Sequence, residues 1–298
     1  MNTQSESRES LSIHSLYENG ISVLEEAQCA YPQLEAEILL AHILGCRRLE
    51  MRMNSDRAVK SDQIEEYLSM IERRALGEPV AYLIGEQEFM SLTFKVGPGV
   101  LIPRRETEIL VEKAVERYKD YQRVEGLDVG TGCGCIPISI ITYLSGDVRY
   151  TGVDISMAAI RTALENSKLH RIDHKIEFTL SDMFSTLPRT LSYDLITANL
   201  PYVTEEEFTR VAPEVKDHEP SSAIVAGEDG LDLIQKFVKT AWSFLKPGGS
   251  CFIEIGYSQA EQVTTLFAED GHYEDIEVFQ DYSGYDRVVT AVKKESNG

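Results

Sequence analysis

From residue 104 onward, strand-like and helical segments alternate along the chain, and this pattern constrains the fold more than any other feature. The strand-like segments are short and apolar, and helical periodicity fills most of the intervals between them. Strands that alternate with helices predict an α/β fold with a mostly parallel, doubly wound sheet. We expect strands at 126–129, 149–153, 175–180, 193–198, 250–255 and 286–292, with helices that include 105–118, 156–169 and 230–245.

Residues 1–79 are predicted to form a separate helical domain. Apolar residues recur at helical spacing over 34–44, and Gly45 is a typical residue to end that helix. A second helix is expected to begin with a capping signal at Ser61-Asp62 and to end at Gly77. This region is net acidic, so we interpret it as a bundle that packs or docks a partner, and not as a nucleic-acid-binding arm.

Residues 80–103 change to short segments of β-type residues. Tyr82–Gly85 and Leu92–Val96 read as two strands, and a Gly-Pro-Gly sequence follows them. We therefore expect a β-hairpin that links the helical domain to an α/β domain at 104–298. A length of 298 residues agrees with two domains, at about 150 residues per domain.

The charge balance and hydropathy exclude several classes of function. The chain has 29 Lys and Arg against 49 Asp and Glu, a formal net charge of −20. A protein that grips duplex nucleic acid needs basic side chains against the phosphates, so this balance weighs against bulk nucleic-acid binding. We see neither a run of about 18 apolar residues nor a signal-peptide pattern at the polar start. The expected location is the cytoplasm.

The five cysteines do not suggest a disulfide framework, because they are odd in number and irregularly spaced. Cys133 and Cys135 form a C-x-C pair, but no second pair or nearby histidine completes a zinc site. We expect reduced thiols and no bound metal.

A glycine-rich turn follows the strand predicted at 126–129. The run Gly130-Thr131-Gly132-Cys133-Gly134 lies between that strand and a predicted helix that begins near Ile136. Glycines let the backbone approach a ligand closely, and the N–H groups of such a turn face it. The spacing is G-x-G-x-G, which differs from the G-x-G-x-x-G fingerprint of dinucleotide sites. A tight turn that only packs helix on strand is the alternative.

Acidic residues end the next two predicted strands. Asp154 stands where an acid can accept hydrogen bonds from both ribose hydroxyls of a nucleoside, which suits S-adenosylmethionine (SAM) as well as NAD. Asp182 is a candidate acceptor for an adenine amino group, with Met183 covering the adenine face. For Asp182, a loop cap is the alternative.

The run Asn199-Leu200-Pro201-Tyr202 follows the fourth predicted strand and decides the chemistry. The Asn199 side-chain oxygen and the carbonyl of Leu200 can each accept one N–H of a planar NH₂ group, on which the Tyr202 ring can stack. Because the lone pair of such a nitrogen is delocalised, two aligned acceptors supply the orientation and charge stabilisation that methyl transfer needs. A simple turn built on Asn and Pro is the alternative.

With these motifs in place, the chain resembles the PrmC/HemK family, the N(5)-glutamine methyltransferases of peptide chain release factors. The resemblance extends from about residue 30 to residue 293. The matching runs are 77–85, 100–108, 128–134, Glu219-Pro220, Gly230-Leu231, Pro247-Gly248-Gly249, Glu254-Ile255-Gly256 and 281–289.

The resemblance implies a class I, Rossmann-like SAM-dependent methyltransferase domain with a seven-stranded sheet, preceded by a helical bundle and a β-hairpin. The implied reaction is methyl transfer from SAM to the glutamine of the Gly-Gly-Gln motif in release factors. The implied catalytic residues are Asn199, Pro201 and Tyr202, and the substrate-binding residues are these together with Leu200, Arg104 and Thr107, the last two near the entrance. The implied SAM-binding residues are Gly130, Thr131, Gly132, Cys133, Gly134, Asp154, Asp182, Met183 and Asn199.

One position departs from the family pattern, which is usually Asn-Pro-Pro-Tyr. Leu200 keeps the backbone carbonyl but lacks the restraint that proline places on φ. The same four letters resemble those of ribosomal-RNA adenine dimethyltransferases, so an adenine-N6 methyltransferase acting on RNA or DNA is the rival hypothesis. A non-catalytic SAM-binding module is the third. The net charge favours the release-factor enzyme over the nucleic-acid enzyme. We expect a monomer whose partner is a release factor, with no direct contact to nucleic acid and none to a membrane.

Overall fold

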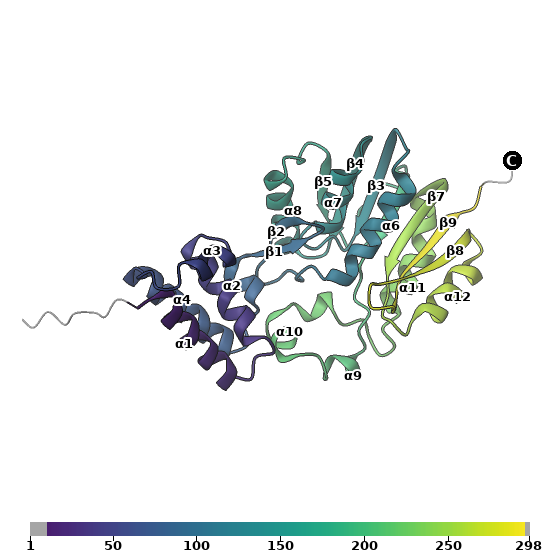
Figure 1. Cartoon of the computed structure of the whole chain (residues 1–298). Coiled ribbons are helices and arrows are strands. Elements are labelled where there is room, and N and C mark those ends of the chain that lie inside the picture. The colour runs from purple at the N-terminus through teal and green to yellow at the C-terminus, as the bar shows by residue number, and fades with distance from the viewer. Residues whose placement is uncertain (1–10, 296–298) are drawn as a thin grey trace, which may run out of the picture. The chain divides into compact units, whose positions relative to one another are not determined.

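Residues 11–295 are described in the computed structural model, and the chain divides into two units (Figure 1). The first unit extends to Gly85 and also includes Pro213–His218, while the second contains Glu86–Ala212 and the chain from Glu219 onward. Across the described part of the chain, no helix has the length and apolar character needed to span a membrane.

Helices form the first unit. Its helices are α1 (Ile13–Glu26), α2 (Pro32–Leu44), α3 (Arg48–Met53), α4 (Ser61–Ala75), α5 (Val80–Ile84) and α10 (Pro213–His218). The predicted helices α2 and α4 are confirmed, and Gly45 ends α2 in the left-handed conformation, with a φ of 60°. The predicted capping signal at Ser61-Asp62 is wrong. Helical geometry already begins at Ser61, so Lys60 occupies the N-cap, and no side chain caps the helix.

A buried arginine joins three elements of this unit. Arg74 of α4 is 5% exposed, and its guanidinium donates to Glu35 of α2 at 2.9 Å and to Glu214 of α10 at 2.7 Å. A buried charge is tolerated only when it is paired and hydrogen-bonded. This ion-pair group therefore explains why the short helix α10, distant in sequence, belongs to the first unit.

Tyr67 of α4 places a hydroxyl group in the core of the first unit. Its side chain is fully buried, and Tyr67 Oη has no hydrogen-bond partner within residues 11–295. A buried hydroxyl without a partner costs about 1–3 kcal/mol, so Tyr67→Phe is expected to raise the free energy of unfolding by about 1 kcal/mol. Urea unfolding of the variant beside the wild type measures the difference. A lower free energy of unfolding in the variant would contradict this assignment.

A β-hairpin opens the second unit. Its strands are β1 (Glu86–Phe89) and β2 (Leu92–Lys95), and the turn residues Met90 and Ser91 both have positive φ, as in a type I′ turn. The prediction is right for the second arm and wrong for the first, because Tyr82–Gly85 belong to α5 and to the glycine that ends it. The apolar residues of α5 pack into the helical core, whereas the true first arm exposes two glutamates that hide its strand character.

A seven-stranded sheet forms the centre of the second unit, as the resemblance implies. Its strands are β3 (Arg123–Val129), β4 (Asp147–Asp154), β5 (Ile176–Leu180), β6 (Tyr193–Ala198), β7 (Leu245–Glu254), β8 (Tyr273–Gln280) and β9 (Asp286–Lys293). The strand order is β5-β4-β3-β6-β7-β9-β8, and every pair is parallel except the two that involve β9. The six strands predicted from the sequence are all confirmed. The chain order reverses on either side of β3, which is where such sheets bind ligands.

The helices of the second unit are of two lengths. The longer ones are α6 (Glu108–Tyr118), α7 (Cys135–Tyr143), α8 (Met157–Leu169), α11 (Asp232–Ala241) and α12 (Ala260–Asp270), and the short ones are η1 (Arg105–Thr107), α9 (Glu205–Phe208), η2 (Ser221–Ala223) and η3 (Trp242–Phe244). Helix α7 packs against both α6 and α8, and α11 packs against α12. Apolar side chains of α11 and α12 share one core with those of β3, β6, β7 and β9.

Strand β8 is the element that the sequence pattern does not predict. Only Tyr273 of this strand is buried, and Glu274, Asp275 and Glu277 are exposed. The strand lies at the edge of the sheet, where charged side chains discourage pairing with another chain. Its charge therefore masks the alternation that normally indicates a strand.

Candidate active site

A cavity of about 390 Å³ lies at the carboxyl ends of the parallel strands β3, β4 and β6. It brings together most of the residues that the sequence singles out, although they are far apart along the chain. Those in its lining are Arg104, Thr107, Gly130, Thr131, Gly132, Cys133, Asp154, Asp182, Met183, Asn199, Leu200 and Pro201. Two others, Gly134 and Tyr202, are not part of the lining. The volume is in the range of small-molecule and cofactor sites.

The glycine-rich turn forms one wall of this cavity. Gly130, Gly132 and Gly134 have φ values of 75°, 56° and 81°, in the region that glycine enters readily. The backbone N–H groups of Gly130 and Thr131 both donate to the Val153 carbonyl at 2.9 Å, which ties the turn to β4. A Cβ on Gly132 would meet no atom within 4 Å, so the turn faces open space there. A Cβ on Gly134 would instead come within 3.1 Å of a side chain of α7, so that glycine serves helix packing.

Asp154 ends β4 and presents a carboxylate in the cavity lining. Its oxygens accept the backbone N–H groups of Gly132 at 2.9 Å and of Ser156 at 2.8 Å. Burial raises the pKa of Asp154, and these N–H donors, which favour the charged form, offset only part of that rise. Each carboxylate oxygen can accept more than one hydrogen bond, so Asp154 keeps capacity for two hydroxyl groups.

Apolar surface lies next to this acceptor. Ile155 lines the cavity and is 69% exposed, and Met183 lines it as well. The backbone of Met183 has a positive φ of 49°, and the Ser181 hydroxyl donates to the Met183 carbonyl at 2.9 Å. Hydroxyl acceptors beside an apolar surface suit a ribose joined to a flat base. Sequence reasoning missed Ile155, although a large apolar residue directly after a strand-end acid was an available signal.

Asn199 follows β6, and Thr107 orients its side chain. Asn199 Nδ2 donates to Thr107 Oγ1 at 3.1 Å, which leaves Asn199 Oδ1 to accept from another donor. Thr107 is only 2% exposed and ends η1, so it lies in the wall of the cavity. That Thr107 lies near the entrance stays a prediction.

Leu200 packs its side chain into the core beside the glycine-rich turn. Its side chain is 4% exposed and belongs to the core that β3 and β6 share with α11. Leu200 Cδ2 approaches the glycine-rich turn so closely that a Cβ on Gly130 would come within 3.1 Å of it. Burial of this side chain therefore restrains the loop where the family usually has a proline ring.

Tyr202 directs its hydroxyl to a carboxylate outside the cavity lining. Tyr202 Oη donates to Glu254 Oε1 at 3.1 Å, and burial, together with the charge of Glu254, raises the pKa of Tyr202. The side chain is partly buried, so its position is determined by contacts on the protein side. Sequence reasoning missed Glu254 as a site residue, although it lies in one of the matching runs.

Arg104 is held by a second acid that sequence reasoning missed. The Arg104 guanidinium donates to Glu219 Oε1, and the backbone N–H of Ile102 donates to Glu219 Oε2 at 3.0 Å. Glu219 is 5% exposed, and removing one partner of such a buried pair leaves an uncompensated charge. Glu219 therefore fixes the segment that carries Arg104 into the cavity wall.

Comparison with known proteins identifies the family. The PrmC N-terminal domain matches residues 15–85, and a methyltransferase domain matches residues 122–292. A release factor glutamine methyltransferase of Koribacter versatilis is 37% identical over 286 residues, which are 96% of this chain and 100% of that protein. The chain belongs to the release factor glutamine methyltransferase family. A further member, from Thermodesulfovibrio yellowstonii, is 38% identical and covers 88% of this chain and 93% of its own length.

Membership of the release factor glutamine methyltransferase family confirms the resemblance drawn from the sequence, including the fold. Among solved structures, the T. thermophilus 16S rRNA N2 G1207 methyltransferase aligns with a TM-score of 0.51 at 19% identity, covering 70% of this chain and 50% of that one. At that identity, the likeness concerns the fold alone. It agrees with a class I methyltransferase sheet.

Asp128 is expected to make the free energy of unfolding depend on pH. Asp128 is fully buried beside the glycine-rich turn, and burial raises its pKa from 3.8 to about 6, with the charge of Asp154 adding to the rise. Because the folded state holds the proton more tightly, Asp128 contributes stability that is fully present below the unfolded pKa and is lost as pH rises through about 6.

Asp128→Asn is expected to abolish that contribution. Urea unfolding of both proteins between about pH 4 and about pH 7 measures the difference in their free energies of unfolding. The wild type should gain stability relative to the variant as the pH is lowered through this window. A difference that does not change with pH would contradict the assignment.

Proposed function

We propose that this protein transfers a methyl group from SAM to the side-chain amide nitrogen of the glutamine in the Gly-Gly-Gln motif of peptide chain release factors. The observation that carries the proposal is the 37% identity to a release factor glutamine methyltransferase over the whole length of that relative. The cavity supports it, because an oriented asparagine stands beside a nucleoside-sized site at one sheet edge.

The residues of the cavity fit SAM as the methyl donor. We assign the ribose hydroxyls to Asp154, the faces of the adenine to Ile155 and Met183, and the adenine amino group to Asp182. The turn Gly130–Cys133 lines the cavity and is open at Gly132, where we assign the rest of the SAM molecule. When bound, SAM supplies a methyl group carried on a positively charged sulfur.

Asn199 and Leu200 are assigned to hold the glutamine amide. Because Thr107 accepts from Asn199 Nδ2, Asn199 Oδ1 is directed to accept one N–H of the substrate, and the Leu200 carbonyl is assigned the other. Two acceptors in fixed positions orient the planar amide and stabilise the positive charge that develops on its nitrogen. A strong base is not required, since the nitrogen becomes acidic once it carries the methyl group and can release its proton to water. Pro201 and Tyr202 are assigned to shape this loop.

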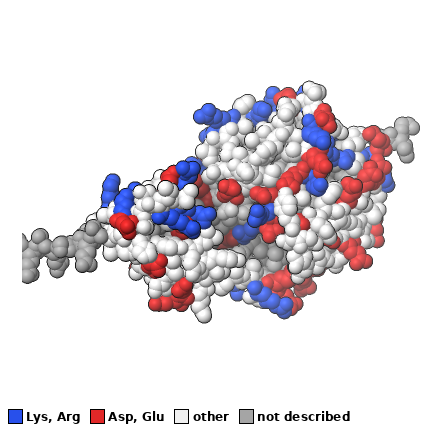
Figure 2. Space-filling view, viewed as in Figure 1, with Lys and Arg blue, Asp and Glu red and all other residues white. Residues whose placement is uncertain are grey.

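A protein partner agrees with the charge of the molecule better than a nucleic acid does. The net charge is −20, and Figure 2 shows Lys and Arg side chains scattered among Asp and Glu side chains on the visible face. We assign docking of the release factor to the helical unit, where Leu49, Met53 and Leu76 are 70%, 77% and 82% exposed. Such apolar surface favours contact with another protein. We place the enzyme in the cytoplasm, where its proposed substrate would be synthesised.

Incubation with labelled SAM tests the proposal. The acceptors are a release factor, the same factor with alanine in place of the Gly-Gly-Gln glutamine, and ribosomal RNA. We expect label in the unaltered release factor only. Label in RNA alone would favour the adenine-N6 methyltransferase, and no label in any acceptor would favour a non-catalytic SAM-binding module.

A further inference from the structure

Glu254 is a buried acid that the proposed chemistry does not use. It ends β7 and is 1% exposed. Ala198 of β6 pairs with Ile253 of β7, so Asn199 and Glu254 leave the two neighbouring strands at the same edge of the sheet. Burying a carboxylate is costly unless it is hydrogen-bonded or paired, and burial raises the pKa of Glu254. The unfavourable burial of Glu254 next to the Asn199–Tyr202 loop indicates that its carboxylate has a role there.

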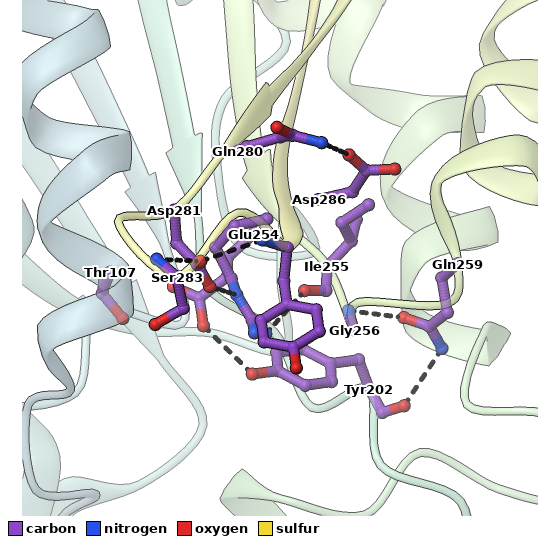
Figure 3. A network of polar contacts seen from close by, with 12 residues as sticks. Thr107, Tyr202, Glu254, Ile255, Gly256, Gln259, Gln280, Asp281, Ser283 and Asp286 are labelled. Carbon is purple, nitrogen blue, oxygen red and sulfur yellow. Dashed lines mark hydrogen bonds and ion pairs between the residues drawn. The ribbon is translucent and has the colours of Figure 1, made fainter.

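One end of that loop is bonded to this acid, and the other end is bonded to a residue near it. At one end, Tyr202 Oη donates to Glu254 Oε1 at 3.1 Å (Figure 3). At the other end, Asn199 Nδ2 donates to Thr107 Oγ1, and the Thr107 hydroxyl lies close enough to Glu254 to lower its pKa. Glu254 Oε2 is buried and has no hydrogen-bond partner within residues 11–295, so the carboxylate acts on the Thr107 hydroxyl through its charge.

The backbone of Tyr202 is held separately from its ring. Gln259 Nε2 donates to the Tyr202 carbonyl at 3.1 Å, and Gln259 Oε1 accepts the Gly256 N–H at 2.8 Å (Figure 3). Gly230 passes so close that a Cβ there would lie 2.2 Å from the Tyr202 carbonyl oxygen, which explains why a glycine stands at that position. With the backbone fixed in this way, the direction of the ring depends on the bond between the hydroxyl and Glu254.

The other charged groups near Glu254 do not replace these contacts. The Arg287 guanidinium is bonded to Asp281 at 3.2 Å and to the Ile255 carbonyl at 3.2 Å, so it lowers the pKa of Glu254 through its charge alone. Glu106, which is exposed, raises that pKa. Glu254 thus bonds Tyr202 at one end of the loop and lies near Thr107, which accepts from Asn199 at the other end.

We propose that Glu254 is a positioning residue, which orients Tyr202 through a hydrogen bond and the Thr107–Asn199 pair through its charge, and so presets the loop for a planar amide without touching the substrate. This inference rests on the proposed function. Glu254→Gln keeps the volume and one acceptor but removes the charge, so Tyr202 loses a charged acceptor and the Thr107 hydroxyl loses the charge beside it. We expect kcat to fall roughly 10-fold, about the effect of one lost hydrogen bond, while KM for SAM stays within about twofold.

The pH profile separates positioning from mere support of the fold. Glu254 acts as an acceptor when ionised, and its pKa is raised. As the pH is lowered, the wild-type kcat should therefore begin to fall at a pH above the ordinary pKa range of glutamate. Glu254→Gln should lose this acid limb. Glu106→Gln is the matched control, because it removes a nearby acid that bonds neither end of the loop, and its maximal kcat should equal that of the wild type.

Unchanged kcat and an unchanged acid limb in Glu254→Gln would overturn the inference. A crystal structure of Glu254→Leu, which keeps the space filled, gives a readout that needs no turnover. We expect the Tyr202 ring and the Asn199 amide to leave their wild-type orientations, and retention of both orientations would also overturn the inference. If the wild type methylates no release factor, the proposed function fails, and the orientations in the crystal decide this inference separately.

Discussion

Replacing Asn199 with alanine is expected to lower kcat by roughly 30- to 1000-fold, because one oriented polar partner of a transition state is worth roughly 2–4 kcal/mol. Asn199 stands at the carboxyl end of β6, and its Nδ2 is already committed to Thr107. Its Oδ1 is therefore the oriented acceptor that the substrate amide would meet. Steady-state methyl transfer to a release factor, at saturating SAM, measures the effect.

Thr107→Val provides the matched comparison for Asn199→Ala. It keeps the Asn199 side chain but removes the hydroxyl that orients it, so kcat should fall by a smaller factor than in Asn199→Ala. Calorimetry measures the affinity of both variants for SAM. A lower affinity reports a lost contact with SAM, whereas an unchanged affinity with a lower kcat reports a lost contact with the substrate amide. A kcat close to that of the wild type in Asn199→Ala would contradict the assignment of this residue.

Asp154→Ala is expected to raise the KM for SAM by roughly 10- to 100-fold, since hydrogen bonds to a charged group contribute about 1.5–3 kcal/mol. At saturating SAM, kcat should remain near the wild-type value, because Asp154 is assigned to the ribose and not to the amide. Asp182→Ala is the matched control at the end of β5. Its side chain is exposed, so its effect on KM should be smaller. An unchanged KM in Asp154→Ala would mean that this carboxylate only caps the N–H groups of Gly132 and Ser156.

Much of the sheet could be predicted from sequence because its central strands are buried and apolar. Strand β6 matches its predicted bounds of 193–198, and β3, β4, β5, β7 and β9 differ mainly at their ends. Strand β8 could not be predicted, since its glutamates are tolerated at a solvent-exposed edge. The first hairpin arm was misplaced because the apolar run 82–85 resembles a strand. Its side chains instead pack into the helical core as part of α5, so tertiary contacts outweigh local propensity there.

Most of the sequence-predicted site residues share one property, which is their place just after a predicted strand, whereas Arg104 and Thr107 were identified through the family resemblance. Asp154, Met183 and Asn199 all follow predicted strands, and the cavity gathers them. The supporting acids, Glu219 and Glu254, have no spacing that relates them to Arg104 or Tyr202 in the sequence. Their partners become visible only when the fold brings together residues that are 115 and 52 positions apart.

The site of the new methyl group tests the central claim most directly. After reaction with this protein and SAM, the release factor is digested, and the peptide that carries the Gly-Gly-Gln motif is fragmented in a mass spectrometer. The account predicts the added mass of one methyl group on the glutamine side chain, and a much smaller methylated fraction in parallel reactions with Asn199→Ala that are stopped at the same early time. A methyl group on any other residue, or on ribosomal RNA but not on the factor, would contradict it.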